Sequence, residues 1–449
     1  MKIFNQALLI AVFSFLWVVA GCGSSQDDVV VLSGSGGSSP VASLRVLPSE
    51  AVAAQGSRRR YRVVAEYQDG TVQDVTGQAT LESDSPSVSV DGEGRATVAL
   101  DAPHGNSVVV RATFGGRTAE AVLNLAHFAY ICNYADDNLS KGTVQADGSI
   151  LVDRLGVPTG DGPIDLALSS SGTKLYVANS RDNTVQSFGV ASNGSLTSLG
   201  TTPTGASPRA IALDPLERFA FVVNQSSQSV SSYLINSDGS LSRNGGDQIV
   251  EAGPTSGVVD PEGRFLYVTS SLTSRITSFA INSDGTLSRV ESTAYAANRS
   301  PGFGAGSIVT DPTGRNVYVT NVSSAQVYSF AADENGVLSP LGSPAVAIRD
   351  TFGLAIDPTG SFVYAANGSV DFLTNYAVQG DGSLQNLGTP TPTGDGPIAV
   401  SVDASGRYMY VVSANSGTVG AYTIEADGSP DGIRSDIVGD DPQDIVTTP

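Results

Sequence analysis

The stretch PRAIALDPLERFAFVVNQ, residues 208–225, decides the fold of most of the chain. Its apolar residues form two short runs on either side of Asp214-Pro215, a dipeptide that favours a tight turn. The pattern predicts two β-strands joined by that turn.

Close copies of this stretch recur along the sequence. An Asp-Gly or Asn-Gly turn has its glycine at positions 148, 194, 239, 285, 336, 382 and 428, so the spacings are 46, 45, 46, 51, 46 and 46. A fixed period of this length is typical of repeat architectures. Each copy is predicted to hold four strands, which is one blade of a β-propeller. Residues 127–449 therefore divide into seven blades of about 46 residues each.

The two ends of the repeat region predict how the propeller closes. The first copy begins at HFAYICNY, residues 127–134, which matches the second strand of a blade. The chain finishes with PQDIVTTP, residues 442–449, which matches the first strands PIDLAL and PIAVSV. We expect the C-terminal segment to complete the first blade, since this leaves no open sheet edge.

Residues 42–126 form a separate unit with short alternating strands broken by turn residues, which predicts a β-sandwich. The segments AEYQDGTVQDVT (65–76), SDSPSVSV (83–90) and GEGRATV (92–98) resemble bacterial immunoglobulin-like domains. Leu81 stands where those domains often have a tryptophan. The resemblance implies a spacer or adhesive module. The run Arg58-Arg59-Arg60 is interpreted as a solvated strand end.

The first residues indicate export. Lys2 precedes an apolar stretch that is too short for a typical membrane span, and residues 1–21 are interpreted as a signal peptide. Val19-Ala20-Gly21-Cys22 resembles the lipobox of bacterial lipoproteins, which implies acylation of Cys22 and anchoring in a bilayer. Residues 22–41 are predicted to be a flexible tether. Because Gly23 and Ser24 follow the cysteine, the outer membrane of a Gram-negative envelope is expected.

The charge of the chain excludes some partners. Its net charge is −20, so a nucleic acid, which repels an anionic surface, is not expected to bind. Only two histidines are present, His104 in the sandwich and His127 at the domain junction, and neither is expected on the ligand-binding face. Cys132 occupies a strand position where other copies have Ala or Val, and we interpret it as a small buried hydrophobe.

The repeats DPTGRNVYVTN (311–321), DPEGRFLYVTS (260–270) and YLINSDGSLS (233–242) resemble the seven-bladed lactonase-type propellers. That family includes 6-phosphogluconolactonases and a muconate-cycloisomerising branch, and it is related to YVTN-type surface propellers. The resemblance implies an all-β fold in which a seven-bladed β-propeller follows the immunoglobulin-like β-sandwich.

The family's catalytic pattern is mostly missing from this chain. Where the pattern has Pro-His, Pro163 is followed by Ile164, and where it has Pro-Arg-His, Pro208-Arg209 is followed by Ala210. Further departures are Gln225 in place of a glutamate and Ile398 in place of an arginine. The resemblance therefore carries over one residue, Arg209, as an anion-binding group. Pairing of Arg209 with a nearby aspartate is the alternative.

Four aspartates lie at equivalent positions of three consecutive blade junctions: Asp161, Asp395, Asp440 and Asp441. Symmetry places them on one side of the channel mouth, where clustered carboxylates could hold Ca²⁺. Ordinary turn chemistry in a solvated loop is the favoured explanation of the same residues. The longest loop on this face, 291–306, is interpreted either as a lid or as tolerated length variation.

Together these features favour a lipid-anchored envelope protein whose propeller binds a protein, a glycan or a small molecule. We leave catalysis open and do not favour it, because the usual histidine and glutamate are missing. The alternative is a lactone hydrolase acting on sugar acid lactones, with Arg209 orienting the substrate and an aspartate as base.

Overall fold

The computed structural model describes residues 39–53, 57–99, 107–125, 127–145, 147–295, 305–322 and 324–448. These residues form strands almost throughout, with one 3-10 helix, η1 (Thr76–Gln78), which confirms the predicted all-β class. Within the same ranges, no helix has the length and apolar character that crossing a bilayer requires. Cys22, His104 and residues 296–304 of the predicted lid lie outside the described residues.

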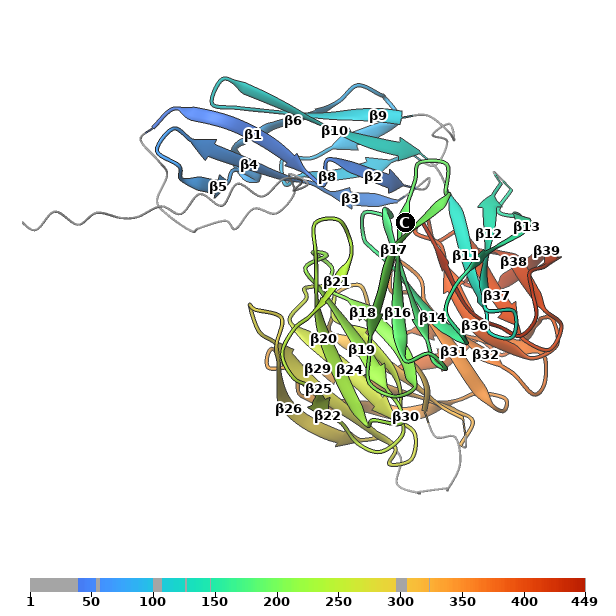
Figure 1. The fold of residues 1–449 in the computed structure, drawn as a ribbon. Helices are drawn as coiled ribbons and strands as arrows, with labels where there is room; N and C mark the ends of the chain where they lie inside the picture. Colours follow the sequence, from blue (N-terminus) through green and yellow to red (C-terminus); the bar gives the residue numbers. More distant parts are fainter. Residues whose placement is uncertain are drawn as a thin grey trace, which may run out of the picture.

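The N-terminal unit, drawn in blue to cyan in Figure 1, contains three small sheets. The first holds β1 (Val41–Leu47), β4 (Arg62–Tyr67) and β5 (Val72–Asp74). The second has the order β2 (Glu50–Ala53), β10 (Arg117–Leu125), β9 (Ser107–Phe114) and β6 (Thr80–Ser83). The third holds β3 (Arg58–Arg60), β8 (Arg95–Val98) and β7 (Val88–Val90).

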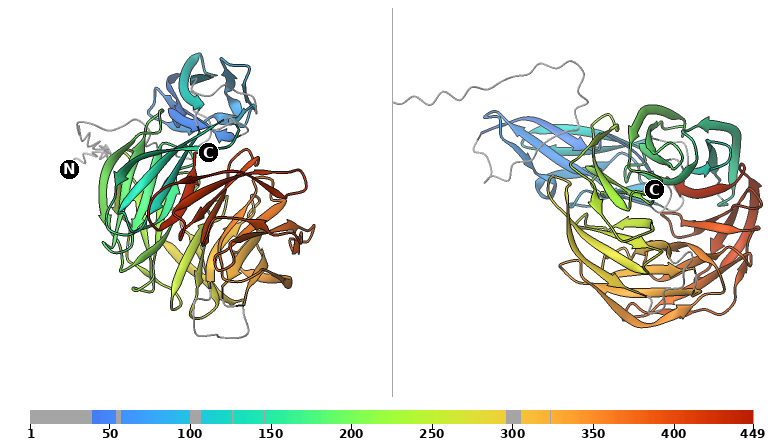
Figure 2. Two further views of the ribbon diagram at one scale, coloured as in Figure 1. Left: turned by 90° about the vertical axis from the view of Figure 1, so that its right-hand side faces the viewer. Right: turned by 60° about the horizontal axis from the view of Figure 1, so that its bottom comes forward.

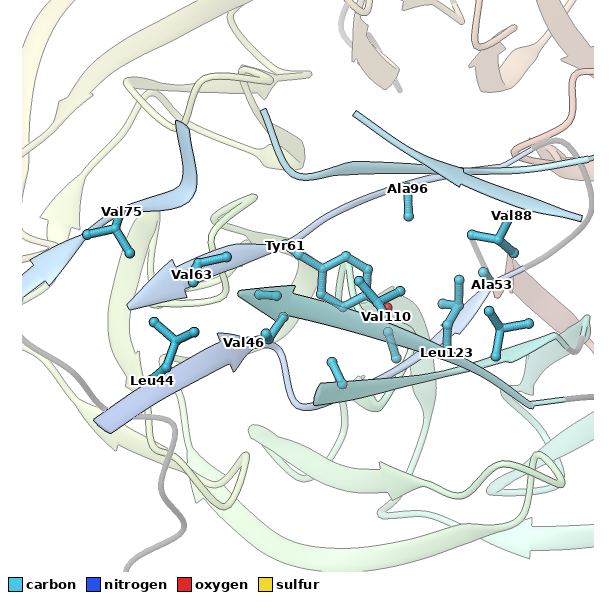
Figure 3. Packing of buried hydrophobic residues seen from close by; sticks show 14 of the residues in the cluster. Leu44, Val46, Ala53, Tyr61, Val63, Val75, Val88, Ala96, Val110 and Leu123 are labelled. Atoms are coloured by element: carbon cyan, nitrogen blue, oxygen red, sulfur yellow. The ribbon is translucent and has the colours of Figure 1, made fainter. Parts of the chain in front are cut away.

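One apolar core joins these sheets. Alternate residues of each strand are buried, as in β9, because successive side chains point to opposite faces of a sheet. Figure 3 shows Tyr61 near the middle of this core, with Val63 and Val110 close to it. Leu81 is partly buried against the same core. The unit therefore has an apolar core of its own.

The remaining described strands form seven sheets, called blades 1 to 7 in chain order. Blade 1 holds β40 (Pro442–Thr447), β11 (Phe128–Asn133), β12 (Asn138–Val144) and β13 (Ile150–Pro158). Blade 2 holds β14 (Pro163–Leu168), β15 (Lys174–Asn179), β16 (Thr184–Val190) and β17 (Leu196–Pro203). Blade 3 holds β18 (Pro208–Leu213), β19 (Phe219–Asn224), β20 (Ser229–Ile235) and β21 (Leu241–Arg243), with β22 (Gln248–Ile249) also paired to β20.

The other four blades repeat this order. Blade 4 holds β23 (Pro254–Val259), β24 (Phe265–Ser270), β25 (Arg275–Ile281) and β26 (Leu287–Ala294). Blade 5 holds β27 (Ala305–Thr310), β28 (Asn316–Asn321), β29 (Gln326–Ala332) and β30 (Leu338–Val346). Blade 6 holds β31 (Thr351–Ile356), β32 (Phe362–Asn367), β33 (Phe372–Val378) and β34 (Leu384–Asn386), with β35 (Thr391–Pro392) also paired to β33. Blade 7 holds β36 (Pro397–Val402), β37 (Tyr408–Ser413), β38 (Thr418–Ile424) and β39 (Pro430–Ile437).

The first strands of the blades form a closed circle. Each packs against the next, in the order β14, β18, β23, β27, β31, β36, β40 and back to β14. The circle depends on the C-terminal strand β40, which runs antiparallel to β11 and places Ile445 opposite Ile131. The blades are thus arranged radially around a central axis, with their first strands innermost (Figures 1 and 2).

The N-terminal unit lies against one face of the propeller, beside blades 1 to 3. The Val52 amide donates a 2.8 Å hydrogen bond to the carbonyl of Ser171, in the turn between β14 and β15. The Val52 side chain packs with buried residues of blades 1 and 2. Both domains therefore meet in a packed interface near the C-terminus (Figure 2).

The interpretation of the arginine run 58–60 as a solvated strand end is wrong for its middle residue. Arg59 is 8% exposed, whereas Arg58 and Arg60 are exposed. Strand alternation turns this one side chain inward. Its Nε donates to the Val52 carbonyl at 2.9 Å and its Nη1 to the Arg58 carbonyl at 2.8 Å. Arg59 thereby supports the strand that contacts the propeller.

Candidate functional site

Two sets of loops lie on the face of the propeller opposite the N-terminal unit, and we call it the site face. One set joins the last strand of a blade to the first strand of the next, and the other joins the second and third strands. Each first strand starts at this face, so its first residues surround the central axis there, at a place that we call the channel mouth. Loops and channel mouths are where propellers usually place ligands.

The four junction aspartates lie in the first set of loops, where two of them join the junction loop to a loop of the blade that it enters. The Asp161 amide donates to Asp182 Oδ2 at 2.8 Å, and the Asp440 amide donates to Asp136 Oδ2 at 2.9 Å. These contacts use the backbone of each junction residue. They fix the loops that frame the channel mouth.

The other two junction aspartates bond through their side chains. Asp395 Oδ1 accepts a hydrogen bond from Asn415 Nδ2 at 3.0 Å, and Asp441 Oδ1 accepts one from Gln443 Nε2 at 2.6 Å. Across the described ranges, no three or more His, Cys, Asp or Glu side chains group as metal ligands. Local turn contacts account for these four residues, and calcium binding by them stays a prediction without support from the geometry.

The second residues of the first strands differ sharply around the channel. The positions where the family pattern would place His or a second Arg are filled by Ile164, which is 9% exposed, and by the partly exposed Ile398. The remaining second residues are Gln443, Arg209, Thr255, Gly306 and Phe352. Arg209 is therefore the only ionisable residue in this ring of seven.

Arg209 is half-buried at the start of β18. In the part of the chain that the structure describes, no acceptor bonds its guanidinium and no carboxylate oxygen lies within the ion-pair distance of 4.0 Å. Burial lowers the pKa of Arg209, while the nearby Tyr134 and Asp165 raise it. The guanidinium stays protonated, since even a lowered arginine pKa lies far above neutrality. The expected pairing with a neighbouring aspartate is not formed.

Sequence reasoning missed two aspartates at this place: Asp165, whose charge acts on Arg209, and Asp444, whose charge acts on Asp165. Asp165 and Asp444 are the third residues of β14 and β40, the neighbouring first strands of blades 2 and 1. Asp165 Oδ2 accepts a 2.7 Å hydrogen bond from the Ile211 amide, and Asp444 Oδ2 accepts a 3.0 Å bond from the Leu166 amide. Each carboxyl group therefore bridges its own first strand to the next one.

The environment of this pair favours the protonated carboxyl. Burial raises the pKa of Asp165 well above its usual value, and the charge of Asp444 raises it further. Burial also raises the pKa of Asp444, to about 7, against the opposing effect of hydrogen bonds from the Leu166 and Ile445 amides. Lost solvation and mutual repulsion therefore disfavour ionisation of both carboxyl groups at the same time.

Cys132 lies behind the pair on β11. Its Sγ is 3.9 Å from the Asp444 carbonyl oxygen, and the side chain is buried. Burial raises the pKa of this thiol well above its usual value, and the charges of Asp444 and Asp165 add to the effect. The thiol is protonated and a poor nucleophile, which agrees with its interpretation as a small buried hydrophobe. His127 is buried at the other end of β11, away from the site face.

A signal for the carboxyl pair exists in the sequence. The third residues of the other first strands, where they are described, are small: Ala210, Ser256, Ser307, Gly353 and Ala399. A carboxylate at such a position departs from the repeat. The two carboxylates form a pair only because β40 lies next to β14 in the closed circle of first strands.

Comparison with known proteins agrees with this architecture. The family model described as Lactonase, 7-bladed beta-propeller matches residues 151–254, 250–367 and 347–447. A search of curated proteins finds no match. The N-terminal unit lies outside the residues that the family model covers.

Solved structures with the same fold share little sequence with this chain. A protein of Bacteroides uniformis assigned as a 6-phosphogluconolactonase has a TM-score of 0.65 at 22% identity, with 72% of this chain and 99% of that chain covered. The periplasmic gluconolactonase of Pseudomonas aeruginosa has a TM-score of 0.62 at 21% identity, with 72% and 99% covered. The match to the family model over most of the propeller decides the assignment: the chain belongs to the lactonase family of seven-bladed β-propellers.

Proposed function

We propose that the protein is an exported, lipid-anchored envelope protein whose propeller binds a small anionic ligand at the channel mouth beside Arg209. The signal-like N-terminus and Cys22 support export and acylation. A periplasmic gluconolactonase among the similar structures is consistent with export. The N-terminal unit serves as an immunoglobulin-like spacer that presents the site face away from the membrane.

The unpaired guanidinium of Arg209 carries this proposal. A half-buried arginine has lost part of its hydration, so an anion that reaches it forms charge-assisted hydrogen bonds. Ile164 and Ile398 flank the channel without offering a base, which favours binding over turnover.

Calorimetry with gluconate tests the proposal on the full chain purified in detergent. Binding to the wild type is expected, with at least a tenfold loss of affinity in Arg209→Ala, because one charged hydrogen bond contributes about 1.5–3 kcal/mol. Arg434→Ala is the matched control, since this exposed arginine pairs with Asp436 on the outer strand β39. Equal affinities of Arg209→Ala and the wild type would contradict the proposal.

A lactone hydrolase is the second candidate, and the pKa of Asp444 favours it. A general base works best when its pKa lies near the operating pH, and that of Asp444 is about 7. In this reaction Asp444 would take a proton from water as the water oxygen attacks the lactone carbonyl carbon. Arg209 would stabilise the oxyanion, and the proton would pass to the ring oxygen as the carbon–oxygen bond breaks.

Turnover of gluconolactone, measured above its spontaneous hydrolysis, separates the two candidates. A rate lost in both Asp444→Asn and Arg209→Ala, with Arg434→Ala unaffected, would establish the hydrolase. A rate equal to the spontaneous one, together with gluconate binding, leaves the binding function.

Metabolic labelling with a fatty acid tests the anchor. The wild type is expected to incorporate label, and Cys22→Ser is expected to incorporate none. Incorporation into Cys22→Ser would refute acylation at this residue.

A further inference from the structure

Arg209 and the Asp165–Asp444 pair lie on three consecutive first strands, β18, β14 and β40. Asp165 and Asp444 each use Oδ2 for a backbone amide of the next blade. Both side chains keep part of their surface exposed, and the Ile445 amide also acts on the Asp444 carboxyl group. Arg209 lies close enough to Asp165 for their charges to interact, yet beyond ion-pair distance. A ligand that reaches the Arg209 guanidinium can therefore also meet Asp165, with Asp444 on the next strand.

The hydrogen-bond donors at the channel mouth determine which chemical group of a ligand can bind there. The Arg209 guanidinium offers N–H donors, and a protonated carboxyl group offers one O–H donor. A carboxylate accepts both kinds of hydrogen bond, and it forms two parallel bonds with a guanidinium.

We infer that the channel mouth binds the carboxylate of a monoanionic ligand between Arg209 and the Asp165–Asp444 pair, and that binding takes up a proton from solvent. The inference rests on the proposed function, since it specifies the ligand of the same site. A carboxylate placed beside Asp444 would repel it while Asp444 is ionised. Binding therefore favours the protonated pair, and affinity falls as pH rises.

The electrostatics select against a ligand of higher charge. The chain carries a net charge of −20, so every added negative charge on the ligand costs energy. A phosphate ester would bring up to two more charges to a site with one cation. A neutral sugar would leave the guanidinium unpaired. A monocarboxylate matches the single arginine.

The other titratable groups around the Asp165–Asp444 pair do not account for the expected proton uptake. Cys132 on β11 faces the pair as a neutral thiol. Tyr134, after β11, lies near Arg209 and is stacked against Arg181, whose guanidinium carbon is 4.1 Å from the ring centre. Arg181 is itself 3.6 Å from Asp137. Strands β36 and β37, on the other side of β40, carry no charged side chain.

Calorimetry of gluconate binding in two buffers with different ionisation enthalpies measures the proton uptake directly. At pH 8 we expect an uptake approaching one proton per ligand and an affinity that falls about tenfold per pH unit, as linkage of one proton requires. At pH 5.5 both effects should be small. The full chain is used, with glucose and 6-phosphogluconate as comparison ligands.

The variants separate this inference from the proposed function. Asp444→Asn keeps an acceptor for the Leu166 amide and is expected to abolish most of the uptake, whereas the exposed Asp431→Asn should leave it unchanged. Binding that requires Arg209 but takes up no proton at pH 8, or tighter binding of 6-phosphogluconate than of gluconate, would overturn the inference and leave the proposed function standing. Failure of gluconate to bind at any pH would overturn both.

Discussion

At the residue scale, Asp444 shows how closure of the ring gives a side chain unusual properties. An aspartate in an open strand would ionise near pH 4. On β40 the same side chain loses solvation, and its pKa rises to about 7. The raised pKa requires that β14 and β40 are neighbours. The pKa of a residue near the end of the chain therefore depends on residues almost 300 positions earlier.

The raised pKa of Asp444 predicts the direction of the pH dependence of stability. Because the folded pKa exceeds the unfolded one, protonation stabilises the fold, and this contribution is lost as pH rises from about 4 to about 7. Each pKa unit corresponds to about 1.4 kcal/mol. In denaturant titrations, Asp444→Asn is expected to reduce the loss of unfolding free energy between pH 5 and pH 8.

Asp431→Asn is the control for that titration, because Asp431 is exposed on β39. Its pH dependence should match that of the wild type. An Asp444→Asn curve that runs parallel to the wild-type curve would show that Asp444 ionises normally.

At this scale the sequence predicts Arg209 as a site residue, but it does not predict the Asp165–Asp444 pair. Arg209 follows a family motif, and its position on a first strand could be read from the repeat. The roles of Asp165 and Asp444 could not, because each depends on a hydrogen bond to a different blade. The repeat position of the junction aspartates predicts a shared site, whereas their contacts in the structure fix loops.

At the element scale, the recurring Asn-Gly or Asp-Gly turn connects neighbouring blades. Gly194 has a φ of 74°, in the region that favours glycine, and a Cβ there would lie 2.7 Å from the ring of Phe128. The Gly194 carbonyl accepts a 2.8 Å hydrogen bond from the Tyr130 hydroxyl. The glycines of several other blades likewise lie against an aromatic ring of the preceding blade. The motif that revealed the repeat thus packs the blades together.

Gly194→Ala is expected to destabilise the propeller by about 1–3 kcal/mol, because it adds backbone strain and a clash with a buried ring. Thermal unfolding followed by circular dichroism measures the loss. Gly189→Ala in the same blade is the control, since its nearest neighbour would be 3.9 Å away and its φ is ordinary. Equal melting temperatures for the two variants would contradict this account of the motif.

The order of strands within a blade was predictable, because strands of alternating residues separated by turn dipeptides leave few other arrangements. The short additional strands β22 and β35 were not, since each pairs over only two residues. Such pairing is decided by the path of the loop and leaves no periodic pattern.

At the scale of the whole molecule, the N-terminal unit and the propeller are joined by an interface that the sequence did not predict. Glu217 occupies a turn position where blades 4 to 7 have glycine, and its φ is 58°. Its carboxylate accepts hydrogen bonds from the Ser170 hydroxyl at 2.8 Å and from the Ser171 hydroxyl at 3.1 Å. Ser171 in turn accepts from Val52. The unusual backbone of Glu217 therefore supports the contact between domains.

Glu217→Gly is expected to relieve the strained turn and to loosen the interface. Hydrogen exchange of the Val52 amide should become faster by at least tenfold, while core amides of blade 5 stay protected. Glu262→Gly is the matched control, because Glu262 lies in the equivalent turn of blade 4 and pairs with the local Arg264. Unchanged exchange at Val52 in Glu217→Gly would show that the interface does not depend on this residue.

The binding of a monocarboxylate beside Arg209 is the central claim, and a crystal structure of the full chain with gluconate at pH 5.5 tests it most directly. The account predicts density for the ligand carboxylate within hydrogen-bond distance of the Arg209 guanidinium and of Oδ1 of Asp165 or Asp444. A ligand bound elsewhere on the propeller, with water filling the space beside Arg209, would contradict it.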